Sequence, residues 1–412
     1  MSASEQVAPG LQGFSAEREA RRTALILAAA QAIIGSAAPI CFALGALAGH
    51  YMLGMDKSLA TAPLTGFNVG VALGALPAAA IIRRLGQRDG FLTGTGLTAL
   101  GGLIATIALF LSHFWLFAFG LAIVGFGGAF VQQFRFAAAD NAPPAFKARA
   151  ISFVLAGGVF TALLGPQVVI FTKDLFQPVA FAGAFASLVV LAAIGALVLL
   201  LLRPRPFVEK TEHLASTGRP LRVIVTRPRF VTALTCAVGS YAMMTFVMTG
   251  APLAMVGCGF SPDEATLGIS WHIMAMYVPS FFTGRLIHRF GASTIVAVGF
   301  LLLIGCGLIA LSGLELWQFW LSLILLGLGW NFGFIGATAI VSECYTAEEN
   351  GKVQGFHDFV LFSTVAFGSL MSGVVYNVGG WDMLAWLLFP VCGLCLAMLA
   401  LQAVIDRRAQ PV

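Results

Sequence analysis

The sequence predicts an all-α integral membrane protein with twelve transmembrane helices in two six-helix bundles. Of its 412 residues, 59% are hydrophobic and 10% are charged, whereas a soluble domain carries about 25% charged residues. The apolar residues gather in runs long enough to cross a bilayer, which takes about 20 residues. One long polar stretch, residues 203–229, divides these runs evenly. A lipid bilayer is therefore the expected surrounding of this chain.

Twelve apolar segments reach the required length. Each predicts a helix, because a helix satisfies all of its backbone hydrogen bonds internally and so suits the hydrocarbon interior. The segments cover residues 23–48, 60–82, 91–112, 114–137, 150–172, 179–202, 230–257, 264–287, 293–313, 317–342, 352–376 and 383–405.

Basic residues indicate which side of the membrane each loop occupies. Arginine and lysine cluster before the first span, after every second span and in the polar stretch, whereas only Lys57 and Lys173 fall on the other side. By the positive-inside rule both termini are cytoplasmic, as an even number of spans requires. The first apolar run is longer than the core of a signal peptide and is predicted to be a span. We expect a multi-pass membrane protein with both termini in the cytoplasm.

The two halves of the chain resemble each other. RRLG at 83–86 recurs as HRFG at 288–291, and GFG at 125–127 recurs as GLG at 327–329, each offset by about 203 residues. Such repeats predict two bundles related by an axis along the membrane normal. The predicted division is a tail at 1–22, a bundle at 23–202, a cytoplasmic loop at 203–229, a bundle at 230–406 and a tail at 407–412.

Two charged pairs repeat with the same offset. Asp140 with Arg149 corresponds to Glu343 with Lys352, and nine residues separate the members of each pair. All four lie at predicted cytoplasmic helix ends. We expect these residues to act as gating contacts.

Twelve spans, a central loop and repeated halves resemble the major facilitator superfamily over nearly the whole chain. GRLIHRFG at 284–291 keeps the frame of the family's loop motif, with His288 in place of the acidic residue, and AAIIRRLG at 79–86 has Arg83 there. The resemblance implies an alternating-access transporter of a small-molecule cargo that works as a monomer without a cofactor. The sequence lacks GxSxG, HExxH and Walker motifs, so an enzyme is not expected, and neither is a nucleic-acid partner.

Spans seven and eight carry two pairs of soft donor residues. Met244 and Met248 are four apart, as are His272 and Met276. Residues four apart lie on the same helix face, and an ionisable side chain inside a span usually faces a cavity. Thioether and imidazole groups suit Cu(I). We expect these four residues to face one passage and bind the cargo, as metal ligands if the cargo is copper.

The same stretch resembles the CcoA-like branch of the superfamily. MTFVMTGAPLAMVGCG at 244–259, WHIMAM at 271–276 and PSFFTG at 279–284 carry the resemblance. Some members of that branch import copper for cuproenzyme assembly, and others, the RfnT type, import riboflavin. The motif is common to both. Copper importers carry additional thiols, whereas here Ser240 stands one turn beyond Cys236, which favours riboflavin.

A riboflavin site also needs aromatic walls and a few polar groups. Trp271 beside His272, Trp330 beside Asn331 in span ten, and Gln132 in span four are candidates. We include Trp271 and Asn331 in the expected substrate site. Efflux of another small molecule by a promiscuous facilitator is a further alternative, which would need no strict set of residues.

Overall fold

The computed structural model describes residues 9–143, 146–204, 218–346 and 349–409, and within them it contains α-helices and no strand. The predicted all-α class is confirmed. In the first half of the chain the helices are α1 (Pro9–Ile34), α2 (Ala37–Met52), α3 (Ala62–Leu85), α4 (Gln87–Phe110), α5 (Phe114–Val131), α6 (Phe134–Asp140), α7 (Lys147–Thr172) and α8 (Ala182–Leu199). In the second half they are α9 (Leu221–Val225), α10 (Pro228–Gly257), α11 (Pro262–Tyr277), α12 (Ser280–Phe290), α13 (Ala292–Leu311), α14 (Leu316–Ser342), α15 (Asn350–Trp386) and α16 (Leu388–Ala409).

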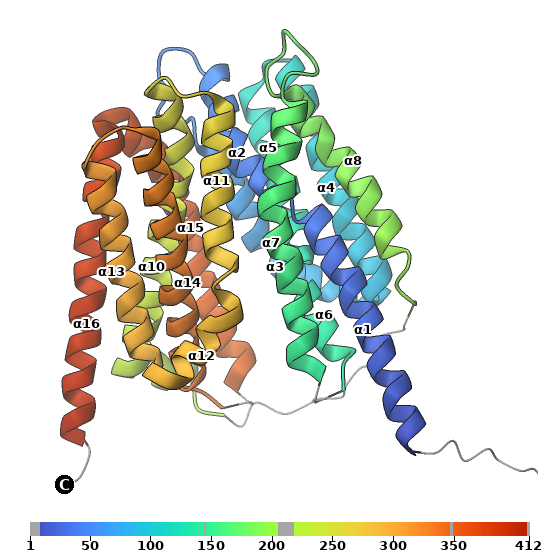
Figure 1. The fold of residues 1–412 in the computed structure, drawn as a ribbon, viewed down its shortest axis with the longest axis vertical. Coiled ribbons are helices and arrows are strands. Elements are labelled where there is room, and N and C mark those ends of the chain that lie inside the picture. Colours follow the sequence, from blue (N-terminus) through green and yellow to red (C-terminus); the bar gives the residue numbers. More distant parts are fainter. Residues whose placement is uncertain (1–8, 144–145, 205–217, 347–348, 410–412) are drawn as a thin grey trace, which may run out of the picture.

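The helices form two groups, α1–α8 and α10–α16 (Figure 1). The start of α1 and the end of α16 lie at the same end of the molecule, the lower end in Figure 1. Between the groups, α3 contacts α15, α7 contacts α11, and α2 contacts both α10 and α11. These six contact-forming helices therefore surround the space between the two groups.

Ten helical segments of the described chain are long and apolar enough to cross a membrane. The difference from the twelve predicted spans has two causes. Residues 352–406 count as one segment although they hold two predicted spans, separated near Gly380 with its φ of 65°. Predicted span eight is broken into α11 and α12 around Pro279, since proline lacks the N–H that would continue the helix, and each piece alone is too short.

The domain boundaries predicted above remain predictions. Residues 1–8 of the first tail, 205–217 of the central loop and 410–412 of the last tail lie outside the described residues. In the described part, a large hydrophobic core joins residues of the second half, from Ile224 to Leu399, with Ala162 as its member from the first half. Separate cores fill the first half.

The repeated glycines explain why the halves share a sequence pattern. A Cβ atom on Gly125 of α5 would lie 2.0 Å from the Phe67 carbonyl oxygen of α3, and one on Gly327 of α14 would lie 2.5 Å from the His272 carbonyl oxygen of α11. Neither position can carry a side chain without moving a neighbouring backbone. Small residues allow membrane helices to pack this closely, so GFG and GLG mark the same helix contact in each half.

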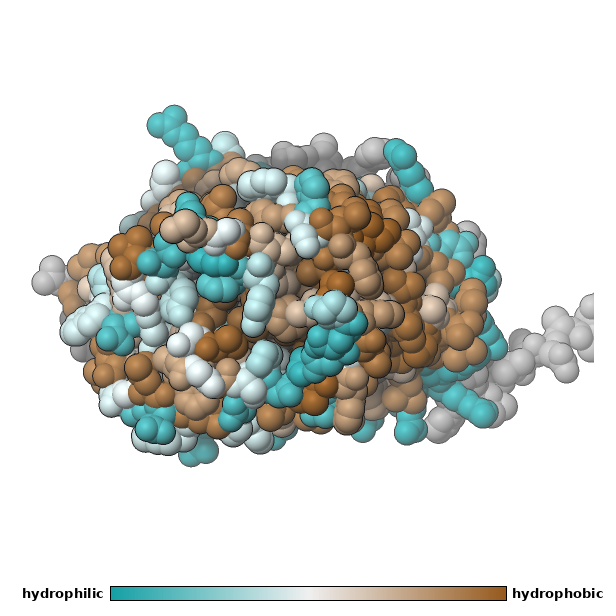
Figure 2. Space-filling view, turned by 90° about the horizontal axis from the view of Figure 1, so that it is seen from above, coloured by the Kyte–Doolittle hydropathy of each residue, from teal (hydrophilic) through white to brown (hydrophobic). Residues whose placement is uncertain are grey.

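The outer surface is apolar along the helices. Leu76, Phe171 and Val378 are each at least 75% exposed, which suits contact with lipid tails. Seen from the upper end, hydrophilic residues gather in patches among hydrophobic ones (Figure 2). The protein is therefore a multi-pass membrane protein.

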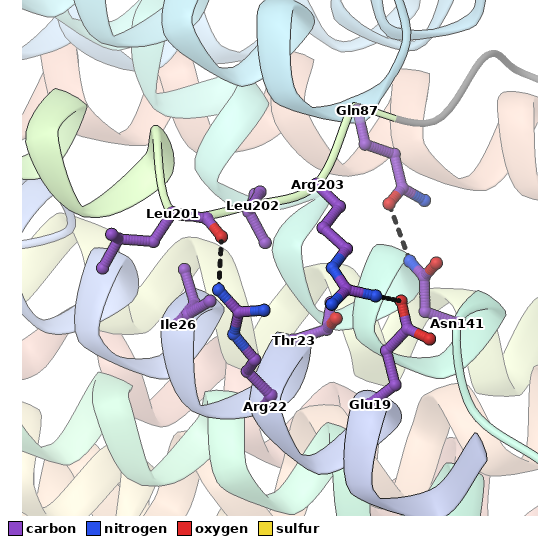
Figure 3. A pocket seen from close by; sticks show the side chains of 9 residues that line it. All are labelled: Glu19, Arg22, Thr23, Ile26, Gln87, Asn141, Leu201, Leu202 and Arg203. Carbon is purple, nitrogen blue, oxygen red and sulfur yellow. Dashed lines mark hydrogen bonds and ion pairs between the residues drawn. The ribbon is translucent and has the colours of Figure 1, made fainter. Parts of the chain in front are cut away.

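A polar network at the lower end ties α1 to the end of α8 (Figure 3). Arg203 pairs with Glu19 at 3.4 Å, and Arg22 donates to the Leu201 carbonyl at 3.4 Å. Beside them, Asn141 donates to Gln87 at 2.7 Å and so joins the end of α6 to the start of α4. The network fixes the chain where it leaves the first helix group.

A second network fixes the chain where it enters the other group. Arg219 holds the buried carboxylate of Glu349 through Nε at 2.8 Å and Nη2 at 2.7 Å. Arg219 also donates to the Cys344 carbonyl at 3.1 Å, and Lys352 donates to the Arg219 carbonyl. The guanidinium of Arg219 lowers the pKa of Glu349 from its usual value of 4.5 to about 2.

Candidate substrate site between the helix groups

A cavity with an empty volume of about 990 Å³, including its open mouth, lies between the two helix groups. The lining comes from both groups and is mainly apolar, with a few amides and hydroxyls. From α1 to α7 the lining residues include Gln31, Phe42, Phe67, Thr98, Gln132 and Thr161, and from α10 to α15 they include Tyr241, Met244, Thr245, Met248, Ile273, Met276, Tyr277 and Phe362.

Three of the four predicted sulfur and imidazole residues line this cavity. Met244 and Met248 lie on one face of α10 with Tyr241, and Met276 lies on the face of α11 that carries Tyr277. The i, i+3, i+4 and i+7 spacing of these positions produces a continuous helix face. The structure therefore brings the Met pair of α10 and Met276 together around one space.

His272 does not line the cavity, which corrects the expectation that all four groups face one passage. Its side chain is completely buried, and Nδ1 lies 2.8 Å from the Leu323 carbonyl oxygen of α14. Since each helix residue is rotated by about 100°, His272 lies about 90° from the middle of the face formed by Ile273, Met276 and Tyr277. Its Nε2 has no hydrogen-bond partner among the residues that the structure describes.

Trp271 and Asn331 also lie outside the cavity lining. Trp271 is 43% exposed on the side of α11 opposite Met276. Asn331 is fully buried and joins helices: its Nδ2 donates to the Met276 carbonyl and to Ser280 Oγ, both at 2.7 Å. Its Oδ1 accepts from Thr283 at 2.6 Å. Asn331 thus braces the break between α11 and α12 and holds the backbone of Met276 from behind.

An aromatic cluster stands beside the thioethers. Tyr241 packs edge-on against Trp330 at 5.4 Å and Phe334 at 5.1 Å, and these two rings stack at 14°. Phe362 of α15 meets Tyr241 at 6.3 Å between ring centroids. Tyr241 and Phe362 line the cavity, whereas Trp330 packs behind Tyr241 and does not belong to the lining. Such a wall suits a flat aromatic ligand.

The polar lining groups include residues that the sequence reasoning missed. Gln132 was a candidate, but Gln31, Tyr241 and Tyr277 were not. Gln31 was detectable as a lone amide in the apolar run LILAAAQAII, residues 25–34, and a polar group inside a span usually faces a cavity or a partner. The tyrosines carried no such signal, because aromatic residues are common throughout this chain.

The predicted gating pairs have different partners. Glu343, just after α14, pairs with Arg229 at the start of α10, and Lys352 contacts the backbone of Arg219. Glu343 and Lys352 therefore do not pair, because Glu343 is held by the start of α10 and Lys352 by the polar segment before it. Asp140 and Arg149 are exposed, and no ion pair joins them in the described part of the chain.

The described polar contacts between the two helix groups lie away from the lower end. Lys173, which follows α7, pairs with Asp263 at the start of α11 at 3.4 Å. Thr61 donates to the Leu370 carbonyl at 3.2 Å, and deeper in the molecule Ser270 donates to the Ala162 carbonyl. The contacts of Lys173 and Thr61 hold the groups together at the upper end, and that of Ser270 holds them together further inside.

No group of three or more His, Cys, Asp or Glu side chains comes together among the described residues. The donors that the cavity offers are three thioethers, two amides, and the hydroxyls of threonine and tyrosine. This set can surround a neutral organic molecule, and its thioethers can contact a soft cation or an aromatic face.

The sequence is similar to known transporters along its length. The profile of the Major Facilitator Superfamily matches residues 23–360 and, in an overlapping match, 233–411. The riboflavin transporter RfnT of Brucella anthropi is 46% identical over 383 residues, which is 93% of this chain and 96% of RfnT. The uncharacterized MFS-type transporters YddS and YdeG of Bacillus subtilis are 29% and 28% identical, over 93% and 90% of this chain and 90% and 91% of their own lengths. The chain therefore belongs to the major facilitator superfamily of membrane transporters.

Proposed function

We propose that this protein imports riboflavin across the bacterial inner membrane by alternating access. The observation that carries the proposal is the 46% identity to a riboflavin transporter over nearly the full length of both chains. The cavity agrees with such a cargo, since an aromatic and thioether wall suits the flat flavin ring and the amides suit its polar groups. We place both termini in the cytoplasm and expect the monomer to be the working unit.

In this proposal the cargo contacts Met244, Met248 and Met276 directly. Asn331 and His272 act behind this face, Asn331 through the Met276 backbone and His272 through its contact with α14. Sulfur atoms contact aromatic faces favourably, at about 0.3–1.5 kcal/mol each. The methionines therefore serve as flavin contacts without any metal.

Alternating access requires each end to open in turn. We assign the closed end to Lys173 and Asp263, whose pairing links the two groups in the described state. Asp140 and Arg149 are exposed at the other end, and we propose that they meet the second helix group when that end closes. Glu343 and Lys352 contribute by fixing the start of α10 and the segment before it, respectively.

Copper is the second candidate cargo. The observation that favours it is the convergence of the three methionine sulfurs, which are Cu(I) ligands, on one cavity. The imidazole that was expected to join them faces α14 instead. The site therefore offers a copper ion a thioether set without the nitrogen donor.

The test uses a riboflavin auxotroph that lacks its own importer. Expression of this protein is expected to restore growth at low riboflavin and to raise uptake of radiolabelled riboflavin. Copper accumulation measured in parallel is expected to stay at the level of the empty vector. Absence of rescue together with increased copper uptake would indicate that copper is the cargo. A lower riboflavin content of the cells would indicate efflux.

A further inference from the structure

We infer that the two walls of the cavity recognise different parts of the cargo: Gln31 and Gln132 bind the ribityl chain, and the methionine and tyrosine wall binds the ring. The inference rests on the proposed riboflavin transport and adds which residues distinguish a flavin with a polyol chain from one without it. It follows from how the polar groups are distributed over the lining.

The amides of Gln31 and Gln132 point into the cavity without protein partners. Neither side chain makes a hydrogen bond within the described part of the chain, and both belong to the cavity lining. Gln31 lies at the bend between α1 and α2, where Gly35 leaves room for it: a Cβ on Gly35 would come within 2.8 Å of Gln31 Nε2 and 3.0 Å of Thr161 Cγ2. Gln31 and Thr161 therefore flank the same small space.

The threonines of this wall present acceptors. Thr161 donates its hydroxyl proton to the Gly158 carbonyl at 2.6 Å, and Thr98 donates to the Gly94 carbonyl at 3.2 Å. Each oxygen can also accept a hydrogen bond, and neither accepts one from the residues that the structure describes. Together with two amides that both donate and accept, this wall matches a row of hydroxyl groups, each of which also donates and accepts.

The opposite wall carries no amide and is mainly thioether and hydrocarbon. Met244, Met248 and Met276 are at most 8% exposed, Ile273 and Phe362 lie beside them, and the polar groups of this wall are the hydroxyls of Tyr241, Thr245 and Tyr277. A hydroxyl of the cargo placed against the thioethers and Ile273 would lose its hydrogen bonds to water without replacement, which is unfavourable. A flat ring gains contact area there. The two walls thus favour a single orientation of the cargo.

The experiment compares riboflavin with lumiflavin, which has the same ring and a methyl group in place of the ribityl chain. Each compound competes against radiolabelled riboflavin for uptake by cells that express the full-length protein. The half-inhibitory concentration of lumiflavin divided by that of riboflavin measures selectivity for the ribityl chain. In Gln31→Leu and Gln132→Leu, this ratio is expected to fall by about 2- to 12-fold per substitution, the range for one neutral hydrogen bond.

Met248→Ala is the matched control on the other wall. It is expected to weaken the binding of both compounds equally and so to leave the ratio of their half-inhibitory concentrations unchanged. Quenching of flavin fluorescence by purified protein gives the same two affinities when a variant binds but does not transport, and Gln31→Asn and Gln132→Asn serve where a leucine variant does not accumulate. An unchanged ratio in both glutamine positions would overturn the inference while wild-type riboflavin uptake still supports the proposed function. If wild-type protein neither binds nor transports riboflavin, the proposed function itself is wrong.

Discussion

Replacing Asn331 with leucine separates a residue that touches cargo from one that positions another residue. The substitution keeps the volume similar and removes three hydrogen bonds, to the Met276 carbonyl, Ser280 and Thr283. The carbonyl of Met276 is then left without this donor next to the break at Pro279. We expect the break between α11 and α12 to loosen and the Met276 side chain to lose its fixed position.

The magnitude follows from measured values inside membranes. Interhelical hydrogen bonds there average about 0.6 kcal/mol, so three bonds amount to about 2 kcal/mol. If the second helix group unfolds as a unit, this corresponds to a fall in Tm of roughly 4–8 °C. Thr283→Val removes one of the three bonds and is expected to cost about a third as much.

The assay is thermal unfolding in detergent, with riboflavin binding by fluorescence quenching on the same samples. Trp271→Leu is the matched control on α11, because that side chain is 43% exposed and lies away from the cavity; it is expected to change neither Tm nor affinity. Loss of riboflavin binding in Asn331→Leu with an unchanged Tm would refute the positioning role and indicate direct contact with the cargo.

Three further predictions concern the framework. Pairing with Arg219 lowers the pKa of Glu349 to about 2 from its usual 4.5, so the pair stabilises the fold fully above about pH 4.5 and this stabilisation is lost as the pH falls toward 2. Glu349→Gln should therefore have a lower Tm at neutral pH, and its Tm should depend less on pH between about 2 and 4.5. Equal pH profiles of Tm in the two proteins would contradict the assignment. Gly125→Leu should abolish accumulation of folded protein in membranes, because even a Cβ there would lie 2.0 Å from a backbone oxygen; normal accumulation and elution as a single species would show that α3 and α5 can separate. Lys173→Glu places a like charge beside Asp263 and should open the upper end, which is measured as faster labelling of a cysteine introduced there. The double variant Lys173→Glu with Asp263→Lys exchanges the two charges and should restore the wild-type labelling rate. Equal labelling of the wild type, the single variant and the double variant would show that these residues do not form the gate.

Much of the architecture was predictable from residue types alone. Long apolar runs in lipid must form helices because no water is present to satisfy backbone groups, so the positions of the helices followed from composition. The glycine repeats also carried structural information, since Gly125 and Gly327 occupy equivalent close contacts in the two halves. The resemblance of the stretch from Met244 to Gly284 indicated the branch of the family but not which side chains reach the cargo.

The sequence by itself determined that this chain spans a membrane as repeated helices and that methionines of α10 and α11 lie on common faces. Only the tertiary structure decided which face meets the cavity. His272 and Met276 are four residues apart, yet the rotation of α11 directs one to α14 and the other to the cavity. Helical spacing fixes the angle between two side chains, whereas the packing of neighbouring helices fixes the direction in which that pair points.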